Sequence, residues 1–431
     1  MKKYLIGKLQ SVLKVLARLT VKRYRPFIIG VTGSAGKTST KSAIYYVLSS
    51  SFSVRMGQGN LNNELGLPLV ILGDYKASGG TSFWLKVLLF GSCGLIWRKN
   101  YPKILILEYG ADKPGDMDYL LDIAKPDLAV VTAVGDIPVH VEFYDGPEGV
   151  AREKGKLASS IGLGGNVVLN LDDHFVADMK DLTKSNVTTY GFLAGADLRI
   201  SGFMNRSEDG KPLGISFKLE TGDNFVPVKI DGSLGRAKAY SAAAAAAVGL
   251  IKGMNLVKIS EALSQYHGEP GRCRLLNGVK NTNLIDDTYN SSPIAVISAL
   301  EVLKDLPAHR KVAILGDMAE LGQYTNHAHE EAGKLVVGAA DVLVTVGGKG
   351  KFIADGARKH CHPLKNIYSF ADAEEVAKNI KDIIEPKDLI LIKGSQSMRM
   401  ERIVMEIMSE PRQAKKLLVR QYGKWLKNLK D

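Results

Sequence analysis

The stretch Gly30-Val31-Thr32-Gly33-Ser34-Ala35-Gly36-Lys37-Thr38-Ser39-Thr40 decides the fold of this chain. It follows the apolar run 27–29 and precedes a segment with helical character, 41–48. A strand, a glycine-rich turn and a helix in this order form a cradle for a polyphosphate. Glycines let backbone N–H groups turn inward, and the helix N-terminus adds partial positive charge. We therefore expect an α/β domain that binds a nucleoside triphosphate.

Within the cradle, the Lys-Thr pair is the most specific signal. Lys37 is long enough to reach the β- and γ-phosphates, and the Thr38 hydroxyl can hold Mg²⁺. The strict spacing G-x-x-x-x-G-K-[ST] would need glycine at position 31, where the chain has Val31, so the shorter G-x-x-G-K-T form remains. An ordinary strand–helix turn would not need the Lys-Thr pair. The predicted ATP-binding residues here are Gly33, Ser34, Ala35, Gly36, Lys37, Thr38 and Ser39.

Length and composition indicate a globular protein of two or three domains. The chain has 431 residues, of which 45% are hydrophobic and 24% are charged, both ordinary values. Its three cysteines are scattered and form neither a metal-ligand spacing nor a disulfide framework. This cysteine usage favours a reducing cytoplasm.

Positive charge is concentrated at the two ends. Residues 1–25 carry eight Lys or Arg and no acid, and residues 412–431 carry seven Lys or Arg and one acid. Apolar residues recur at helical spacing in both segments, which predicts two basic amphipathic helices. Such helices lie on an anionic membrane surface or pack their apolar stripe on the protein body, and the sequence leaves both open.

A third apolar segment, 83–97, is interrupted only by Lys86. It is too short to span a bilayer. We expect a buried helix, with an interfacial role for its two tryptophans as the alternative.

The remaining sequence alternates between short apolar runs and helical segments, which predicts parallel sheets. The fold class is therefore α/β, with a P-loop central ATPase domain and a Rossmann-like C-terminal domain. Expected strands are 103–108, 128–132, 166–170, 283–287, 312–316, 341–346 and 388–393, with an antiparallel set within 188–232 and a helix at 239–250. A turn-rich cluster at 267–271 marks a boundary. The expected units are 1–24, 25–268, 269–408 and 409–431.

Polar side chains follow several of these strands, where ligands bind in open α/β sheets. Glu108 ends one strand and suits a Mg²⁺ ligand. His140 follows a strand that ends in Thr132. A loop with Asn60, Asn62, Asn63 and Glu64 can orient phosphates or substrate, although asparagine-rich turns also occur for purely structural reasons.

Nine stretches, in order along the chain, resemble motifs of the Mur ligase family, the ATP-dependent amide-forming ligases of peptidoglycan synthesis. They are 30–40, 60–66, 107–115, 132–142, 149–154, 270–272, 285–293, 315–322 and 393–395. Segments 286–293 and 316–322 favour the MurF type, which adds D-alanyl-D-alanine to a UDP-N-acetylmuramoyl tripeptide. The cradle begins by residue 30, so the resemblance does not include the family's N-terminal UDP-binding domain.

The resemblance implies an ADP-forming ligase that activates a carboxylate as an acyl phosphate, which an amine then attacks. It implies catalytic roles for Lys37, Glu108, His140 and Lys154, and two Mg²⁺ ions held by Thr38, Glu108, His140 and a carbamylated Lys154. Arg272, Asp287, Tyr289 and Asn290 fall where the C-terminal domain closes over the nucleotide. The substrate-binding set is Asn60, Asn62, Asn63, Glu64, His329 and Lys393.

The expected partners are a muramoyl-peptide precursor and the D-alanyl-D-alanine dipeptide. We expect a cytoplasmic monomer with no nucleic-acid partner and with peripheral contact to the inner face of the cell membrane. Two alternatives remain, a Mur-like ligase with another acceptor or amino donor, and a noncatalytic nucleotide-binding partner subunit. The full set of metal-binding residue types disfavours the second, because a scaffold does not need it.

Overall fold

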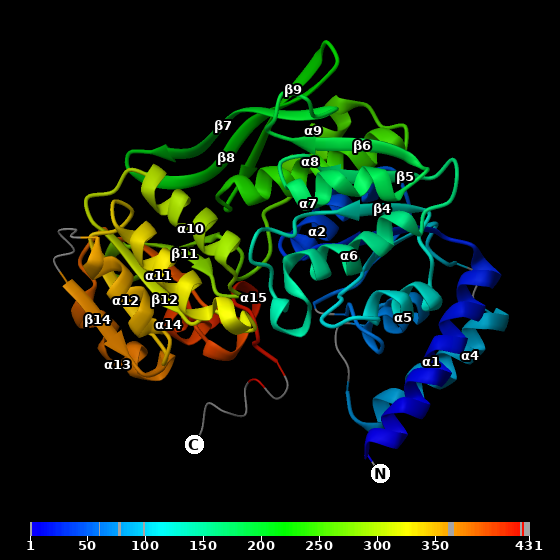
Figure 1. Ribbon diagram of the computed structural model, residues 1–431, viewed down its shortest axis with the longest axis horizontal. Helices are drawn as coiled ribbons and strands as arrows, with labels where there is room; N and C mark the ends of the chain where they lie inside the picture. The colour runs from blue at the N-terminus through cyan, green and yellow to red at the C-terminus, as the bar shows by residue number, and fades with distance from the viewer. Residues whose placement is uncertain are drawn as a thin grey trace.

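Two sheets with helices on both faces make up the computed structural model of the chain (Figure 1). The structure describes residues 2–59, 61–75, 79–97, 100–360, 366–422 and 425. Strands up to Asp231 belong to the first sheet, and strands from Arg274 onward belong to the second. We call the described residues up to 268 the central unit and those from 269 onward the C-terminal unit.

The first sheet has nine strands in the order β2-β3-β1-β4-β5-β6-β7-β8-β9. Pairing is parallel from β2 to β7 and antiparallel from β7 to β9. Their bounds are β1 Phe27–Thr32, β2 Val54–Met56, β3 Ile104–Glu108, β4 Leu128–Val131, β5 Asn166–Asn170, β6 Asn186–Gly191, β7 Leu198–Glu208, β8 Lys211–Thr221 and β9 Asn224–Asp231. Both faces of the parallel part are covered, which explains its continuous apolar runs.

Helices cover the two faces of this sheet unequally. One face packs against α2 (Lys37–Ser49), α8 (Arg236–Ile251) and α9 (Leu256–Ser264). Alanines fill the middle of α8, which lets it lie close to α2, and both are buried there. The other face packs against α1 (Lys2–Tyr24), α3 (Gly66–Leu72), α4 (Thr81–Trp97), α5 (Asp116–Ile123) and α6 (Gly146–Ser159), and the short α7 (His174–Ala177) follows β5.

The second sheet has six strands in the order β10-β11-β15-β12-β13-β14. Only the β10–β11 pair is antiparallel in this sheet as described. The strands are β10 Arg274–Asn277, β11 Asn283–Asp287, β12 Lys311–Gly316, β13 Val342–Val346, β14 Asn366–Phe370 and β15 Leu389–Lys393. Helices α10 (Pro293–Asp305), α11 (Thr325–Val336) and α12 (Gly350–Lys359) cover one face, and α13 (Ala373–Ile383) and α14 (Glu401–Ile407) cover the other.

The expected parallel strands are confirmed to within one or two residues. The expected antiparallel range 188–232 is partly wrong, because its first strand, β6, is parallel to β5. The buried-helix prediction for 83–97 is also wrong, since only Val87 and Gly91 of α4 are buried.

The C-terminal segment does not form the expected single amphipathic helix over its described residues. Helix α15 (Ala414–Leu417) ends after one turn, because Leu418 has extended backbone angles, φ −108° and ψ 156°. Leu418, Val419 and Arg420 are buried. The Arg420 guanidinium donates to the carbonyl oxygens of Thr288 at 2.6 Å and Tyr289 at 3.2 Å. Residues 418–420 are therefore docked on the C-terminal unit.

The sheet topology determines where ligands can bind. Strand β1 lies between β3 and β4, all three are parallel, and their carboxyl ends meet at one edge. The cradle, Glu108 and Thr132 follow these three ends. In an open parallel sheet this edge is the ligand-binding edge.

Candidate active site

The phosphate cradle joins β1 to α2. Gly33 has φ 142°, and a side-chain Cβ there would lie 2.1 Å from the Thr132 hydroxyl oxygen, so only glycine fits. Gly36 has φ 84° and begins α2 without a side-chain cap, which leaves backbone N–H groups at the helix start for an anion. The loop therefore has the backbone geometry that an anion-binding cradle requires.

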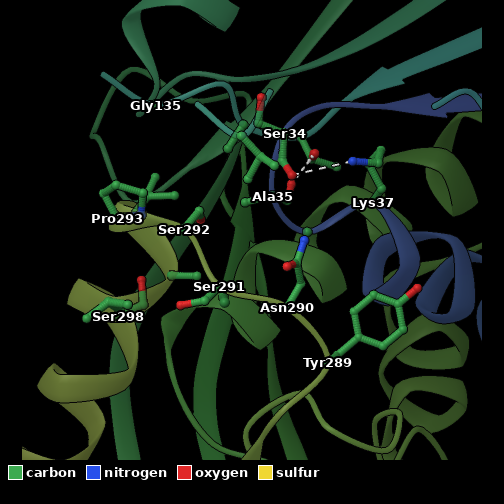
Figure 2. Close-up of a pocket in the computed structure, with 18 of the residues that line it drawn as sticks. Ser34, Ala35, Lys37, Gly135, Tyr289, Asn290, Ser291, Ser292, Pro293 and Ser298 are labelled. Atoms are coloured by element: carbon green, nitrogen blue, oxygen red, sulfur yellow. Dashed lines mark hydrogen bonds between the residues drawn. The ribbon is translucent and has the colours of Figure 1, made fainter. Parts of the chain in front are cut away.

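Lys37 turns back over this loop. Its ammonium donates to the carbonyl oxygens of Gly33 at 2.6 Å and Ser34 at 3.4 Å (Figure 2). Burial lowers the pKa of Lys37, and the Glu108 carboxylate partly offsets that effect. The cation lies beside the loop that would hold the phosphates.

Glu108, at the end of β3, is a buried carboxylate with three side-chain partners. Lys41 pairs with it at 2.9 Å, the Thr38 hydroxyl donates at 3.2 Å and the Asn62 amide donates at 3.1 Å. Burial opposes ionisation of Glu108, but the Lys41 and Lys37 ammonium groups outweigh it and lower its pKa. The adjoining Thr38 hydroxyl and Glu108 carboxylate are the oxygen donors that Mg²⁺ prefers, so these residues fit the expected ion.

His140 connects the two units. Its Nε2 lies 3.2 Å from the Asp112 carboxylate, and its Nδ1 lies 2.8 Å from the carboxylate of Glu320, a residue that follows β12. Hydrogen bonding to His140 lowers the pKa of Glu320. Within the described residues, no three His, Cys, Asp or Glu side chains are grouped as a metal site. The structure therefore gives His140 two carboxylate partners, and its expected role as a metal ligand stays a prediction.

Lys154 is buried on α6 and is 1% exposed. Its ammonium donates to the Ala111 carbonyl at 3.3 Å. Burial, with a contribution from the Lys37 charge, lowers the pKa of Lys154 to about 7. A large fraction of this amine is therefore neutral near pH 7, which makes it a nucleophile.

The C-terminal unit supplies the opposite wall of the site. The Arg272 guanidinium donates to the Thr38 hydroxyl at 3.0 Å and lies 3.9 Å from the centre of the Tyr289 ring. The buried Lys393 donates to the Asp287 carboxylate at 2.7 Å and to the Asn290 carbonyl at 2.9 Å. Lys393 therefore fixes the loop that carries Asp287 and Asn290.

A cavity of about 1230 Å³ lies between these walls. Figure 2 shows Lys37 and Ser34 facing Tyr289, Asn290 and Ser291 across it. The cavity brings together most of the predicted site residues: Ser34, Ala35, Gly36, Lys37, Thr38, Ser39, Asn62, Asn63, Glu108, His140, Arg272, Asp287, Tyr289, Asn290 and Lys393. Gly33, Glu64, Lys154 and His329 are not on its wall, and Asn60 lies outside the described residues.

His329 has a structural environment. It is fully buried on α11, its Nε2 accepts from the Met318 N–H at 2.9 Å, and its Nδ1 lies 2.6 Å from the Thr325 carbonyl oxygen. With both ring nitrogens bonded to backbone, the side chain orients the segment after β12. His329 does not line the cavity, and its expected substrate contact stays a prediction.

Two site residues were not expected from the sequence. Lys41 lies one helical turn after Lys37, on the same face of α2, and this spacing could have indicated it. Glu320 lies inside the 315–322 stretch that carried the resemblance, but its contact with His140 joins segments that are 180 residues apart in the numbering. No local pattern reports such a contact.

Comparison with known proteins agrees with this geometry. The Mur ligase middle domain matches residues 31–83 and 93–249, and the Mur ligase glutamate ligase domain matches residues 271–396. The UDP-N-acetylmuramoyl-tripeptide–D-alanyl-D-alanine ligase of Bacillus subtilis is 28% identical over 93% of this chain and 80% of its own length. The enzyme of the same name from Mycobacterium leprae is 31% identical over 86% of this chain and 71% of its own length.

Solved structures give the same result. The MurF ligase of Thermotoga maritima in complex with ADP superposes with a TM-score of 0.76 and 27% identity, covering 94% of this chain and 84% of that chain. MurF from Acinetobacter baumannii gives a TM-score of 0.77 and 25% identity, covering 92% and 80%. The chain belongs to the Mur ligase family and is an ATP-dependent, ADP-forming ligase of the MurF type.

Proposed function

We propose that this ligase joins the amine of D-alanyl-D-alanine to the terminal carboxylate of a muramoyl tripeptide. The curated relatives carry that reaction in their names. The observation that carries the proposal is the cavity itself, which brings the cradle and Glu108 together with Arg272 and Tyr289. A carboxylate and a triphosphate bound there would be enclosed by both units.

The chemistry follows from these residues. A carboxylate oxygen attacks the γ-phosphorus of ATP, and the bond to the bridging oxygen breaks as ADP leaves. The amine nitrogen then attacks the acyl carbon, loses a proton, and phosphate leaves as the amide forms. Lys37 and the α2 N-terminus would balance charge on the transferred phosphoryl oxygens, where positioning and electrostatics dominate. Closure of the C-terminal unit, with Arg272 over the nucleotide, would exclude water, which otherwise hydrolyses the acyl phosphate.

The proposal includes two Mg²⁺ ions, with Thr38, Glu108, His140 and Lys154 as the protein groups that would hold them. Bound Mg²⁺ neutralises phosphate charge. We also propose that Lys154 is carbamylated. Because the pKa of Lys154 is lowered, its amine can be neutral, and the neutral amine is the form that reacts with CO₂. The resulting carbamate would supply oxygen ligands next to the Lys37 charge.

We further propose that the enzyme is a monomer that contacts an anionic membrane peripherally. This proposal rests on the eight Lys or Arg residues and the absence of acids in residues 1–25. In the part of the chain that the structure describes, no helix has the length and apolar character needed to cross a bilayer.

The test is phosphate release with ATP, D-alanyl-D-alanine and a panel of UDP-linked and lipid-linked muramoyl tripeptides. Lys37→Ala should lose at least about a hundredfold in kcat, because it removes a charge from the phosphoryl site, while its melting temperature stays unchanged. Lys113→Ala, at an exposed lysine that is not on the cavity wall, is the matched control. Near-normal turnover by Lys37→Ala would contradict the assignment, and turnover only with another amine would replace the proposed donor.

A further inference from the structure

Helices α1 and α4 lie side by side and project at one end of the molecule (Figure 1). Gly91 of α4 faces both α3 and α1, since a Cβ there would lie 3.3 Å from the Leu72 side chain and 3.8 Å from the Leu16 side chain. Lys14 and Arg18 of α1 both pair with Asp122 of α5. The pair of helices is therefore anchored to the central unit.

Helix α1 has two apolar stripes. The inner stripe, with Leu13 and Ala17 at 0% exposure, packs on the body. An outer stripe lies on another side of the helix. It consists of Tyr4, Leu5, Val12, Val15 and Leu19, which are 45–66% exposed. An ordinary surface helix has one apolar stripe and a polar outer side, so the outer stripe needs another explanation.

Helix α4 has the same property. Its exposed large side chains are Leu85, Leu89, Phe90, Ile96 and Trp97, at 61–73% exposure. Lys86 is the one charged residue between Thr81 and Trp97. We call the outer stripes of α1 and α4 together the outer face. Exposed apolar surface of this kind marks a docking site.

The charges near the outer face indicate which kind of partner binds there. Residues 1–25 contain no acid, and neither does α4. Lys8 lies within the outer stripe of α1, and Lys22 and Arg23 end the helix. A second copy of the chain would bring these cations against each other. An anionic bilayer instead offers headgroups to the lysines and acyl chains to the apolar side chains.

We infer that the outer face of α1 and α4 is the surface by which this enzyme docks on an anionic lipid bilayer. The inference rests on the proposed membrane contact and names the surface that makes it. Residues 418–420 are not part of this surface, because Leu418, Val419 and Arg420 are buried on the C-terminal unit. Docking would hold the central unit at the membrane with α1 and α4 in the interface.

The experiment compares three full-length proteins. One is the wild type. The outer-face variant carries Val15→Asn, Leu19→Asn, Leu89→Asn and Phe90→Asn. The control carries Leu163→Asn, Leu182→Asn and Leu193→Asn, at apolar positions that are 51–83% exposed elsewhere on the central unit. Each is sedimented with vesicles of phosphatidylglycerol and phosphatidylcholine or of phosphatidylcholine alone, at low and high salt. Phosphate release with soluble substrates is measured in parallel.

The expected result is at least about a tenfold weaker partition for the outer-face variant, with the control and the phosphate release unchanged. Brominated lipid should quench Trp97, and Trp97→Phe should remove that quenching. If the outer-face variant pellets like wild type, the docking surface is wrong although membrane contact stands. If wild type does not pellet at low salt, membrane contact itself is wrong. If the wild type forms a dimer and does not bind vesicles, and the outer-face variant is a monomer, the surface binds a second copy of the chain instead. The vesicle-binding results do not depend on whether the ligase reaction is correct.

Discussion

Glu269 offers a sharp test of how the two units are joined. Its carboxylate accepts hydrogen bonds from the Ser39 hydroxyl at 2.9 Å and the Tyr266 hydroxyl at 3.2 Å, and it pairs with Lys238 at 3.0 Å. Lys238 is 3% exposed and Glu269 is 18% exposed. Burial opposes ionisation of Glu269, but Lys238 and then Arg272 outweigh it and lower its pKa from 4.5 to about 2.

The direction and size of the stability change caused by Glu269→Gln follow from this lowered pKa. Because the carboxyl pKa is lower in the folded state, ionised Glu269 stabilises the fold at pH values above its unfolded-state pKa of 4.5. This stabilisation is lost as the pH falls toward the folded-state pKa of about 2. The displacement corresponds to about 3 kcal/mol. Removing one partner of a buried ion pair costs a similar ~3–5 kcal/mol. Glu269→Gln should therefore lower the free energy of unfolding by about 3 kcal/mol at pH 7.

The assay is urea unfolding followed by fluorescence and circular dichroism at about pH 7.0, 5.5 and 4.0. The two higher values lie above the unfolded-state pKa of 4.5, and the lowest lies between that pKa and the folded-state value of about 2. The difference between wild type and Glu269→Gln should be equal at the two higher pH values and smaller at the lowest. Glu330→Gln is the control, because its pair with Lys359 is exposed, and it should change stability by less than about 0.5 kcal/mol. Lys238→Met combined with Glu269→Gln should recover part of the loss. A cost below about 0.5 kcal/mol for Glu269→Gln at pH 7 would refute the reasoning.

Three further predictions concern the site. Lys154→Ala should lose ligase activity, and added short-chain carboxylates should partly restore it. The wild type should lose activity when CO₂ is removed from the buffer. Full activity of Lys154→Ala would exclude a functional carbamate. Arg272→Lys should raise the KM for ATP about tenfold, because lysine replaces neither the planar stack on Tyr289 nor the bond to Thr38; an unchanged KM would remove Arg272 from the nucleotide site. Gly33→Ala should abolish ATP binding measured by calorimetry, since its Cβ would meet the Thr132 hydroxyl. Gly115→Ala, with φ 90° and open space, should bind ATP normally and lose only about 1–2 kcal/mol of stability.

The fold and one side of the site could be predicted because their signals are local. The cradle is a continuous stretch, and Glu108 ends a strand whose apolar run is visible in the sequence. Parallel topology then places both at the same sheet edge. The contacts that complete the site are not local. Arg272 meets Thr38 across 234 positions, and Glu269 meets Ser39 across 230.

The sequence also did not predict which side chains are buried. An apolar helix has the same sequence whether its outer side is covered or open, so residues 83–97 were expected inside and α4 is found at the surface. His329 shows the converse. The resemblance includes His329 in the substrate-binding set, yet both of its ring nitrogens contact backbone groups. Residue type and position in a motif do not fix which atoms remain free for a ligand.

The contacts between the units also bear on how ligands bind. Arg272 donates to the Thr38 hydroxyl, and Thr38 in turn donates to Glu108, so the groups expected to hold Mg²⁺ are used by the protein itself in this arrangement. His140 is likewise held between Asp112 and Glu320. A metal-bound triphosphate entering the cavity must exchange some of these contacts for its own oxygens. Because the same side chains serve closure and ligand binding, we expect the nucleotide to change how tightly the two units close. Only the differential affinity of the nucleotide for open and closed arrangements can drive that change.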